Sequence, residues 1–256
     1  MEAETSKPKE DPHGLADQSY NRSRWEPTPD LRGYIVSADL RQGLEKLRSE
    51  DALKVLDYGS GGSPYRGLFP NADYKRADCV DLPGLDYVFG DDEKIAEADG
   101  TFDLVLSTQV LEHVRHPQAY LREAFRLLKP GGRIAISTHG LFEEHGAPVD
   151  FRRWTMEGLF CELEDAGFAR EKGWKLTVGP RALIFWWIWQ SRPGRPTWKS
   201  PFGFVWNLLR RFAVKNHGYL NRCADKCFGN YAVTEDGRDA PPIYVGVLAV
   251  GRKEAE

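Results

Sequence analysis

The chain has 256 residues, of which 41% are hydrophobic and 12% aromatic, and it carries a formal net charge of -3. This length and composition favour one globular catalytic domain with extensions over two domains of equal size. The charge excludes a general attraction to nucleic acid, and four scattered cysteines are too few for a disulfide framework, which favours a reducing cytoplasm.

Residues 1–30 contain no apolar run of the kind that a secretory signal requires, so we expect a disordered N-terminal tail. We assign 31–256 to one domain, which begins with an amphipathic helix over 31–50. The apolar side chains of that helix recur at helical spacing and are Ile35, Leu40, Leu44 and Leu47. The predicted location is cytoplasmic, with peripheral contact at a membrane left open.

Strands and helices alternate through the next part of the chain. We predict strands over 53–57, 73–78, 85–89, 102–107, 133–137, 173–179 and 243–252. We predict helices over 92–98, 117–128 and 155–166, the last capped by Thr155 and ended by Gly167. Such alternation is typical of an α/β fold with a doubly wound, Rossmann-like sheet, here of seven strands.

A basic and aromatic insertion, residues 180–242, precedes the last strand, and we expect helices near 182–190 and 204–214 within it. The segment 172–222 holds ten Lys or Arg and no Asp or Glu, beside the aromatic run 185–189. This composition favours contact with phosphate, an acidic substrate or anionic lipid, with 181–214 as the membrane-facing part. The alternative is a packed subdomain with a solvated basic face.

The most informative motif is Asp57-Tyr58-Gly59-Ser60-Gly61-Gly62, directly after an apolar strand. Glycine allows positive φ and lets a ligand lie against the main chain. Asp78 follows 21 residues later, at the end of the next strand, where an acidic residue binds the two hydroxyls of a ribose. A nicotinamide site is disfavoured, because Pro64 replaces the third glycine of that fingerprint.

Four strings in a fixed order resemble the class I S-adenosylmethionine (SAM) dependent methyltransferases, specifically the methyltransferase-11-like group. They are VLDYGSGGSPY, YKRADCVD, FDLVLSTQVLEHV and AFRLLKPGGRIAIS. The string FRRWT at 151–155 resembles a segment of polysaccharide-associated members. The resemblance implies S-adenosyl-L-methionine as the cofactor.

The resemblance also implies roles for individual residues at the strand ends. Gly59, Ser60 and Gly61 would bend around the methionine part of SAM, and Asp57 would hold its ammonium. The ribose and adenine would be bound by Asp78, Cys79 and either Asp91 or Asp92. Thr108 and Gln109 would line the face at which the methyl group is transferred.

The segment after the fifth strand supplies candidates for acceptor chemistry. Either His145 or His139 is expected to act as the base, with Asp150 as its orienter or as an alternative base. The predicted substrate-binding residues are Arg152, Arg153 and Trp154. The two arginines suit an oxyanion on the substrate, because guanidinium groups pair with oxyanions; either arginine could instead pair with Glu143 or Glu144. Glu112 and His113 are given a structural role rather than a catalytic one, and no metal site is predicted.

We therefore expect a methyltransferase that acts on a small-molecule, glycan or glycolipid acceptor, with oxygen favoured over nitrogen or carbon, in polysaccharide or lipid biosynthesis. An RNA methyltransferase or nucleic-acid-binding protein using the basic segment 172–222 is the alternative from another class, and the acidic remainder of the chain argues against it. A non-catalytic protein with this fold is a third. The sequence makes no prediction of oligomeric state.

Overall fold

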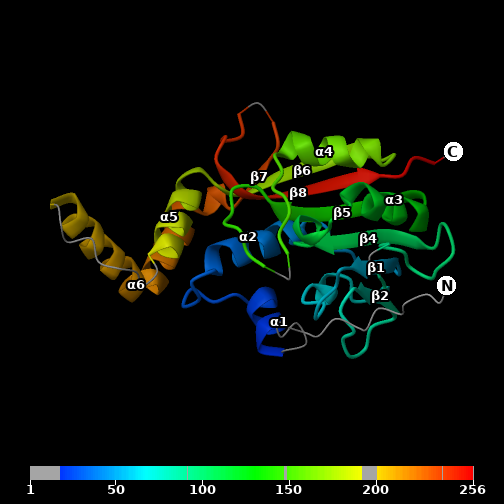
Figure 1. Ribbon diagram of the computed structural model, residues 1–256, viewed down its shortest axis with the longest axis horizontal. Helices are drawn as coiled ribbons and strands as arrows, with labels where there is room; N and C mark the ends of the chain where they lie inside the picture. The colour runs from blue at the N-terminus through cyan, green and yellow to red at the C-terminus, as the bar shows by residue number, and fades with distance from the viewer. Residues whose placement is uncertain (1–17, 91, 147–148, 192–200, 238, 256) are drawn as a thin grey trace, which may run out of the picture.

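The structure is a computed structural model that describes residues 18–90, 92–146, 149–191, 201–237 and 239–255 (Figure 1). Its strands are β1 Lys54–Tyr58, β2 Asp73–Asp78, β3 Tyr87–Val88, β4 Phe102–Thr108, β5 Leu128–His139, β6 Ala169–Val178, β7 Val233–Glu235 and β8 Tyr244–Arg252. Its α-helices are α1 Gln18–Trp25, α2 Tyr34–Glu45, α3 Pro117–Leu127, α4 Met156–Asp165, α5 Gly179–Gln190 and α6 Pro201–Phe228. Three short 3-10 turns are η1 Arg66–Leu68, η2 Leu111–His113 and η3 Gly229–Tyr231.

One sheet runs in the order β3-β2-β1-β4-β5-β8-β6-β7. The first five strands of this order pair in parallel, and β8 enters antiparallel between β5 and β6. The carboxyl ends of β1, β2, β4 and β5 therefore meet at one edge, which is where open α/β sheets bind their ligands.

The predicted α/β doubly wound fold is confirmed, although the sheet formed by the described residues has eight strands where seven were predicted. The additional strand, β7, lies in the expected insertion and pairs antiparallel with β6. A strand of three residues is too short to show a periodic pattern in the sequence. β7 forms because it pairs with β6, which is distant in the chain.

Helices cover both faces of the sheet (Figure 1). On one face, α3 and α4 pack their apolar residues against β1, β4 and β5. On the other, α2 buries Leu40 and Leu44 beside Leu68 of η1. The amphipathic helix expected over 31–50 is thus present, although it is shorter than predicted, and Thr155 caps α4 by accepting a hydrogen bond from the Gly158 N–H.

Two further predictions differ from the structure. No helix forms over 92–98: the Ile95 N–H donates to Glu123 at 2.9 Å, and Arg126 donates to the carbonyl of Glu97, so contacts with α3 shape this stretch. The tail expected over 1–30 contains helix α1, while residues 1–17 lie outside the described part of the chain.

Helices α5 and α6 form an arm that extends from the rest of the molecule (Figure 1). The helices expected over 182–190 and 204–214 are present, although α6 is longer and kinks at Asn216. A buried ion pair joins the base of the arm to α2, with the Arg181 guanidinium 2.7 Å from Asp39 and 2.9 Å from Asp225. Arg181 is therefore not part of a basic surface. None of the described helices has the length and hydropathy to span a bilayer.

Candidate cofactor and acceptor site

The loop after β1 folds back onto the end of β2. Gly59 and Gly61 have φ angles of 78° and 49°, in the region that favours glycine. The N–H groups of Gly59 and Ser60 both donate to the Ala77 carbonyl at 2.9 Å. A Cβ on Gly59 would lie 2.5 Å from the side chain of Val110, so the loop needs glycine for space as well as for its φ.

Asp78 closes this loop from the end of β2. One carboxylate oxygen accepts from the Gly61 N–H at 2.7 Å, and the other accepts from the Val80 N–H at 3.0 Å. Each carboxylate oxygen can accept a second hydrogen bond. The side chain is 6% exposed and lies at the carboxyl edge, so Asp78 is positioned both to shape the glycine loop and to accept from the hydroxyls of a ligand.

Asp57 ends the apolar part of β1 and is 3% exposed. Its carboxylate accepts a hydrogen bond from the Tyr74 hydroxyl at 2.8 Å. Burial raises the pKa of Asp57 to about 7, although hydrogen bonds from Tyr74 and Ser63 oppose this shift. A nearby cation, such as the ammonium predicted for this position, would favour the charged form.

The remaining predicted cofactor residues lie on the neighbouring loops. Cys79 is half-buried against the core, and Asp92 is exposed, whereas Asp91 lies outside the described residues. Thr108 ends β4, and Gln109 adopts a positive φ of 57° while its side-chain amide donates to Ser137 at 3.2 Å. These positions fit a ligand that crosses the carboxyl edge from β2 to β4.

Helix α1 covers the glycine loop, which sequence reasoning missed. A Cβ on Gly62 would overlap the side chain of Asn21, and one on Gly67 would lie 2.8 Å from Trp25. Trp25 is held in place by the Arg41 guanidinium, which stacks at 4.0 Å from a ring centroid. The sequence of α1 has no apolar periodicity from which the helix could have been predicted.

Several buried polar atoms near this edge have no hydrogen-bond partner among the described residues. Three of them are Asn21 Oδ1 on α1, Gln109 Oε1 after β4 and His139 Nδ1 at the end of β5. Buried polar groups are normally paired, so each unpaired atom requires a ligand or a solvent molecule. Together with the glycine loop and Asp78, these atoms fit a polar nucleoside ligand such as SAM.

Beside the expected cofactor site, η2, the end of β5 and the loop after it bring together a glutamate and three histidines, here called the histidine cluster: Glu112, His113, His139 and His145. His139 Nε2 lies 3.3 Å from Glu112 Oε1, and His113 Nε2 lies 4.0 Å from the same oxygen. The His139 and His145 rings meet edge-on with centroids 5.1 Å apart. Burial raises the pKa of Glu112 to about 7, and burial together with nearby cationic side chains lowers the pKa of His139 well below 6.5.

The structure brings the two predicted base candidates and their predicted orienter together. Asp150 Oδ2 accepts from the His145 N–H at 2.9 Å and lies 3.2 Å from His145 Nδ1. The same carboxylate receives two hydrogen bonds of 2.5 Å from Arg153. Although burial acts in the opposite direction, these hydrogen bonds lower the pKa of Asp150 to about 2.

The three predicted substrate-binding residues have different surroundings. The Arg153 guanidinium is engaged by Asp150 and by the carbonyls of Phe142 and Glu143. Trp154 is 6% exposed and packs in the core. Arg152 is exposed and donates to the carbonyls of Val114 and Arg115, each at 3.1 Å.

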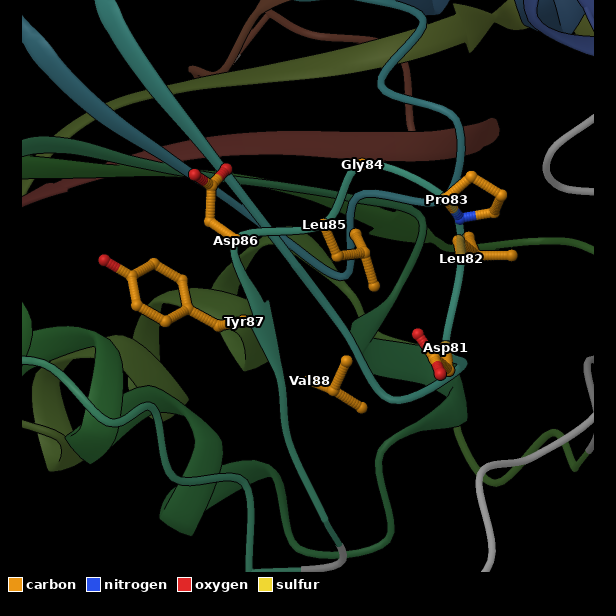
Figure 2. Close-up of a pocket in the computed structure, with 8 residues that line it drawn as sticks. All are labelled: Asp81, Leu82, Pro83, Gly84, Leu85, Asp86, Tyr87 and Val88. Atoms are coloured by element: carbon orange, nitrogen blue, oxygen red, sulfur yellow. The ribbon is translucent and has the colours of Figure 1, made fainter.

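An open hollow of about 420 Å³ lies elsewhere, along the connection from β2 into β3 (Figure 2). It is lined by Asp81 to Val88, a single continuous segment. Two of its polar side chains are already engaged, since Asp86 contacts Lys75 at 3.2 Å and the Tyr87 hydroxyl donates to Glu97. This hollow therefore lacks the convergent polar groups of a ligand site.

Solved structures share the fold. The chain aligns over 94% of its length with 98% of a SAM-dependent methyltransferase, a possible histamine N-methyltransferase, from Thermotoga maritima, with a TM-score of 0.55 and 15% identity. It also aligns over 91% of its length with 86% of the [4+2]-cyclase SpnF, with a TM-score of 0.54 and 17% identity. At such identities the likeness concerns the fold alone.

Curated relatives match the chain over a shorter range. A ubiquinone biosynthesis O-methyltransferase from Ruegeria pomeroyi is 48% identical over 120 residues, which cover 40% of this chain and 48% of the relative. A malonyl-[acyl-carrier protein] O-methyltransferase from Methylococcus capsulatus is 31% identical over 122 residues, covering 41% and 44% of the two chains. The chain thus spans less than half the length of these relatives.

The family model for a methyltransferase domain matches residues 33–168, more than half of the chain. The matched range includes the glycine loop, Asp78 and the histidine cluster described above. The predicted relationship to the methyltransferases is thereby confirmed: the chain belongs to the methyltransferase domain family.

Proposed function

We propose that the protein is a SAM-dependent methyltransferase that methylates an oxygen atom of a small-molecule acceptor. The observation that carries this proposal is the glycine loop closed by Asp78, at the edge where β1, β2 and β4 end. The O-methyltransferase names of the Ruegeria and Methylococcus relatives support oxygen as the target.

The residues that would hold SAM are those of the carboxyl edge. Gly59, Ser60 and Gly61 would contact its methionine part, with Asp57 at its ammonium. Asp78 would accept from the ribose hydroxyls, with Cys79 and Asp92 beside the adenine and with Thr108 and Gln109 facing the methyl group. When bound, SAM supplies an electrophilic methyl group on a sulfonium.

A hydroxyl acceptor must lose its proton as it attacks the methyl group. We propose that His139 is the base that accepts this proton. Its side chain stands at the end of β5, 8% exposed and 3.3 Å from the Glu112 carboxylate. One ring nitrogen would take the proton from the acceptor hydroxyl. Asp150 acts as a positioning residue, since its carboxylate is already engaged by Arg153 and His145.

Substitution of His139 tests this assignment. We expect His139→Gln to lower turnover by roughly 10²-fold or more while S-adenosylhomocysteine binds as before. We expect Asp150→Asn to lower turnover less than His139→Gln does, because Asp150 positions its neighbours and does not take the proton. Unchanged turnover in His139→Gln would remove it as the base.

For the acceptor we propose a glycan or a lipid-linked molecule presented at a membrane surface. The first part of α6 exposes large apolar side chains, with exposed fractions from 37% to 80%: Phe202, Phe204, Val205, Trp206, Leu208, Leu209, Phe212 and Val214. Arg211 and Lys215 lie exposed among them. Apolar groups interleaved with cations suit an anionic bilayer surface.

The arm also supports lipid over nucleic acid as its partner. A hollow of about 550 Å³ between α5 and α6 is lined by Trp186, Trp187, Gln190, Trp206 and Leu209. Nucleic-acid surfaces are dominated by cations that contact phosphates, whereas this face is mainly apolar. Of the basic residues predicted to bind the acceptor, Arg152 is exposed, and the part of its guanidinium beyond Nη1 would pair with an acidic group on the acceptor.

The acceptor class is tested by incubating the protein with methyl-labelled SAM and membrane extract, then separating the products. We expect label in the lipid-extractable fraction or in the glycan fraction, in a linkage stable to base as an ether is. Label in RNA, or in a water-soluble amine alone, would contradict the proposal.

A further inference from the structure

The histidine cluster contains a set of side chains with the chemistry of a metal site. One ligand atom each of Glu112, His113 and His145 lies within 4.8 Å of the other two. Neither SAM binding nor proton transfer by His139 requires all three. We propose that Glu112, His113 and His145 bind a divalent transition-metal ion of the zinc class, and this site lies beyond the cofactor pocket.

The Glu112 carboxylate provides an independent indication. It is fully buried, and its Oε2 is fixed by a hydrogen bond of 2.8 Å from the Thr138 hydroxyl. Its Oε1 has no hydrogen-bond partner among the described residues, although it points at the ring nitrogens of His113 and His139. Leaving a buried carboxylate oxygen without a partner costs free energy, and a bound cation would provide that partner.

The histidine rings are oriented by contacts behind them. His113 Nδ1 lies 2.8 Å from the Val149 carbonyl, which fixes the proton there and leaves Nε2 on the Glu112 side. His145 Nδ1 lies 3.2 Å from Asp150 and 3.3 Å from the Glu143 carbonyl. Metal-binding histidines are typically oriented in this way by a carbonyl or carboxylate on the second nitrogen.

The separations of up to 4.8 Å require the three side chains to move together by a small amount to hold one ion. Ligand atoms at roughly 2.1 Å from one zinc ion stand about 3.4 Å apart in a tetrahedron. The separation of 4.0 Å between His113 Nε2 and Glu112 Oε1 exceeds this by little. Two imidazoles and one carboxylate suit zinc or cobalt rather than magnesium or calcium, which prefer oxygen ligands throughout.

Three protein ligands leave a fourth position open, as in catalytic zinc sites. The ion would lie beside His139, since Glu112 is shared between the two, so an acceptor that His139 deprotonates would be within reach of the open position. An acceptor oxygen bound there would be oriented, and its hydroxyl would become more acidic. This consequence for the acceptor rests on the proposed function, whereas the binding of the ion does not.

Direct metal binding tests the inference on the full chain after treatment with a chelator. Cobalt(II) is titrated with visible spectroscopy, and zinc is titrated by calorimetry. We expect one ion per chain and an intense visible cobalt band typical of a four-coordinate site. We expect Glu112→Gln and His145→Ala each to weaken binding tenfold or more.

A matched control is His116→Gln, which alters an exposed histidine three residues from His113 and outside the cluster. It should bind metal like the wild type, and circular dichroism with S-adenosylhomocysteine binding should show that every variant is folded. Equal affinity in Glu112→Gln, His145→Ala and the wild type, or no stoichiometric binding by the wild type, would overturn the site. Metal binding without S-adenosylhomocysteine binding would contradict the proposed function and leave the metal site standing.

Discussion

At the scale of single residues, the glycine loop combines two requirements that can be separated experimentally. Gly59 and Gly131 have nearly equal φ angles, 78° and 80°. A Cβ on Gly59 would meet Val110 at 2.5 Å, whereas a Cβ on Gly131 would meet nothing within 4 Å. The pair therefore distinguishes backbone strain from steric overlap.

We expect Gly131→Ala to lower the free energy of unfolding by about 1 kcal/mol, the cost of a left-handed conformation. Gly59→Ala should cost more and should also weaken S-adenosylhomocysteine binding tenfold or more, because the loop must move away from Val110. Chemical denaturation and calorimetry measure the two effects. If both variants lost the same unfolding free energy and bound S-adenosylhomocysteine equally well, the overlap with Val110 would have no effect on stability or binding.

The raised pKa of Asp57, about 7, predicts a pH dependence of stability. Between the unfolded pKa near 3.8 and about 7, the folded state holds a proton that the unfolded state has lost. The contribution of Asp57 to stability is therefore largest below the unfolded pKa, declines as the pH rises to about 7, and is constant above that.

Comparison with Asp57→Asn isolates this effect, since an amide retains an oxygen that can accept from Tyr74. Relative to Asp57→Asn, the wild type should lose roughly 2–4 kcal/mol of unfolding free energy between pH 4 and pH 7. Denaturant titrations at several pH values provide the measurement. Parallel curves for the two proteins would show that the carboxyl group titrates alike when folded and unfolded.

At the scale of elements, α1 is expected to act on the cofactor site through its contact with the glycine loop and η1. Trp25→Ala removes the aromatic contact with Gly67 and the stacking partner of Arg41, so S-adenosylhomocysteine should dissociate at least threefold faster. Arg22→Ala is the matched control on the same helix, because that side chain is 82% exposed. The dissociation rates are measured by stopped flow. Equal rates for the two variants would show that the contact of α1 with the glycine loop does not affect cofactor binding.

The arm is tested by sedimentation with vesicles. Combined replacement of Phe202, Phe204 and Leu208 by serine should abolish binding to phosphatidylglycerol vesicles, since it removes exposed apolar surface from α6. A control combines serine at Val88, Leu141 and Ile243, three exposed apolar residues outside the arm. If the control loses binding equally, or the wild type fails to bind, the arm is not a membrane contact.

At the scale of the whole molecule, the elements that alternate along the nucleotide-binding half of the chain were predictable from local pattern and from the motifs at the strand ends. β1, β2, β4, α3 and α4 lie within a few residues of their expected ranges. Elements shaped by distant partners were not predictable. The stretch 92–98 follows hydrogen bonds from α3, and β7 exists through its pairing with β6.

The same distinction applies to the site. The motif Asp57 to Gly61 and the later Asp78 lie on consecutive strands, so the sequence was sufficient to predict that they meet. The resemblance implied a structural role for Glu112. Its approach to His139 and His145 could not be predicted, because it depends on how β5 and the following loop pack. The spacing of these residues along the chain does not predict such a contact.

The most direct test of the central claim is the binding of S-adenosylhomocysteine and SAM to the wild type and to Asp78→Ala, by calorimetry. Asp73→Ala is the control at the opposite end of β2, with a side chain 59% exposed. We predict micromolar binding to the wild type and to Asp73→Ala, and at least tenfold weaker binding to Asp78→Ala, equivalent to about 1.4 kcal/mol. Absence of binding to the folded wild type, or equal affinity in all three proteins, would contradict the assignment of the glycine loop and Asp78 as the SAM site.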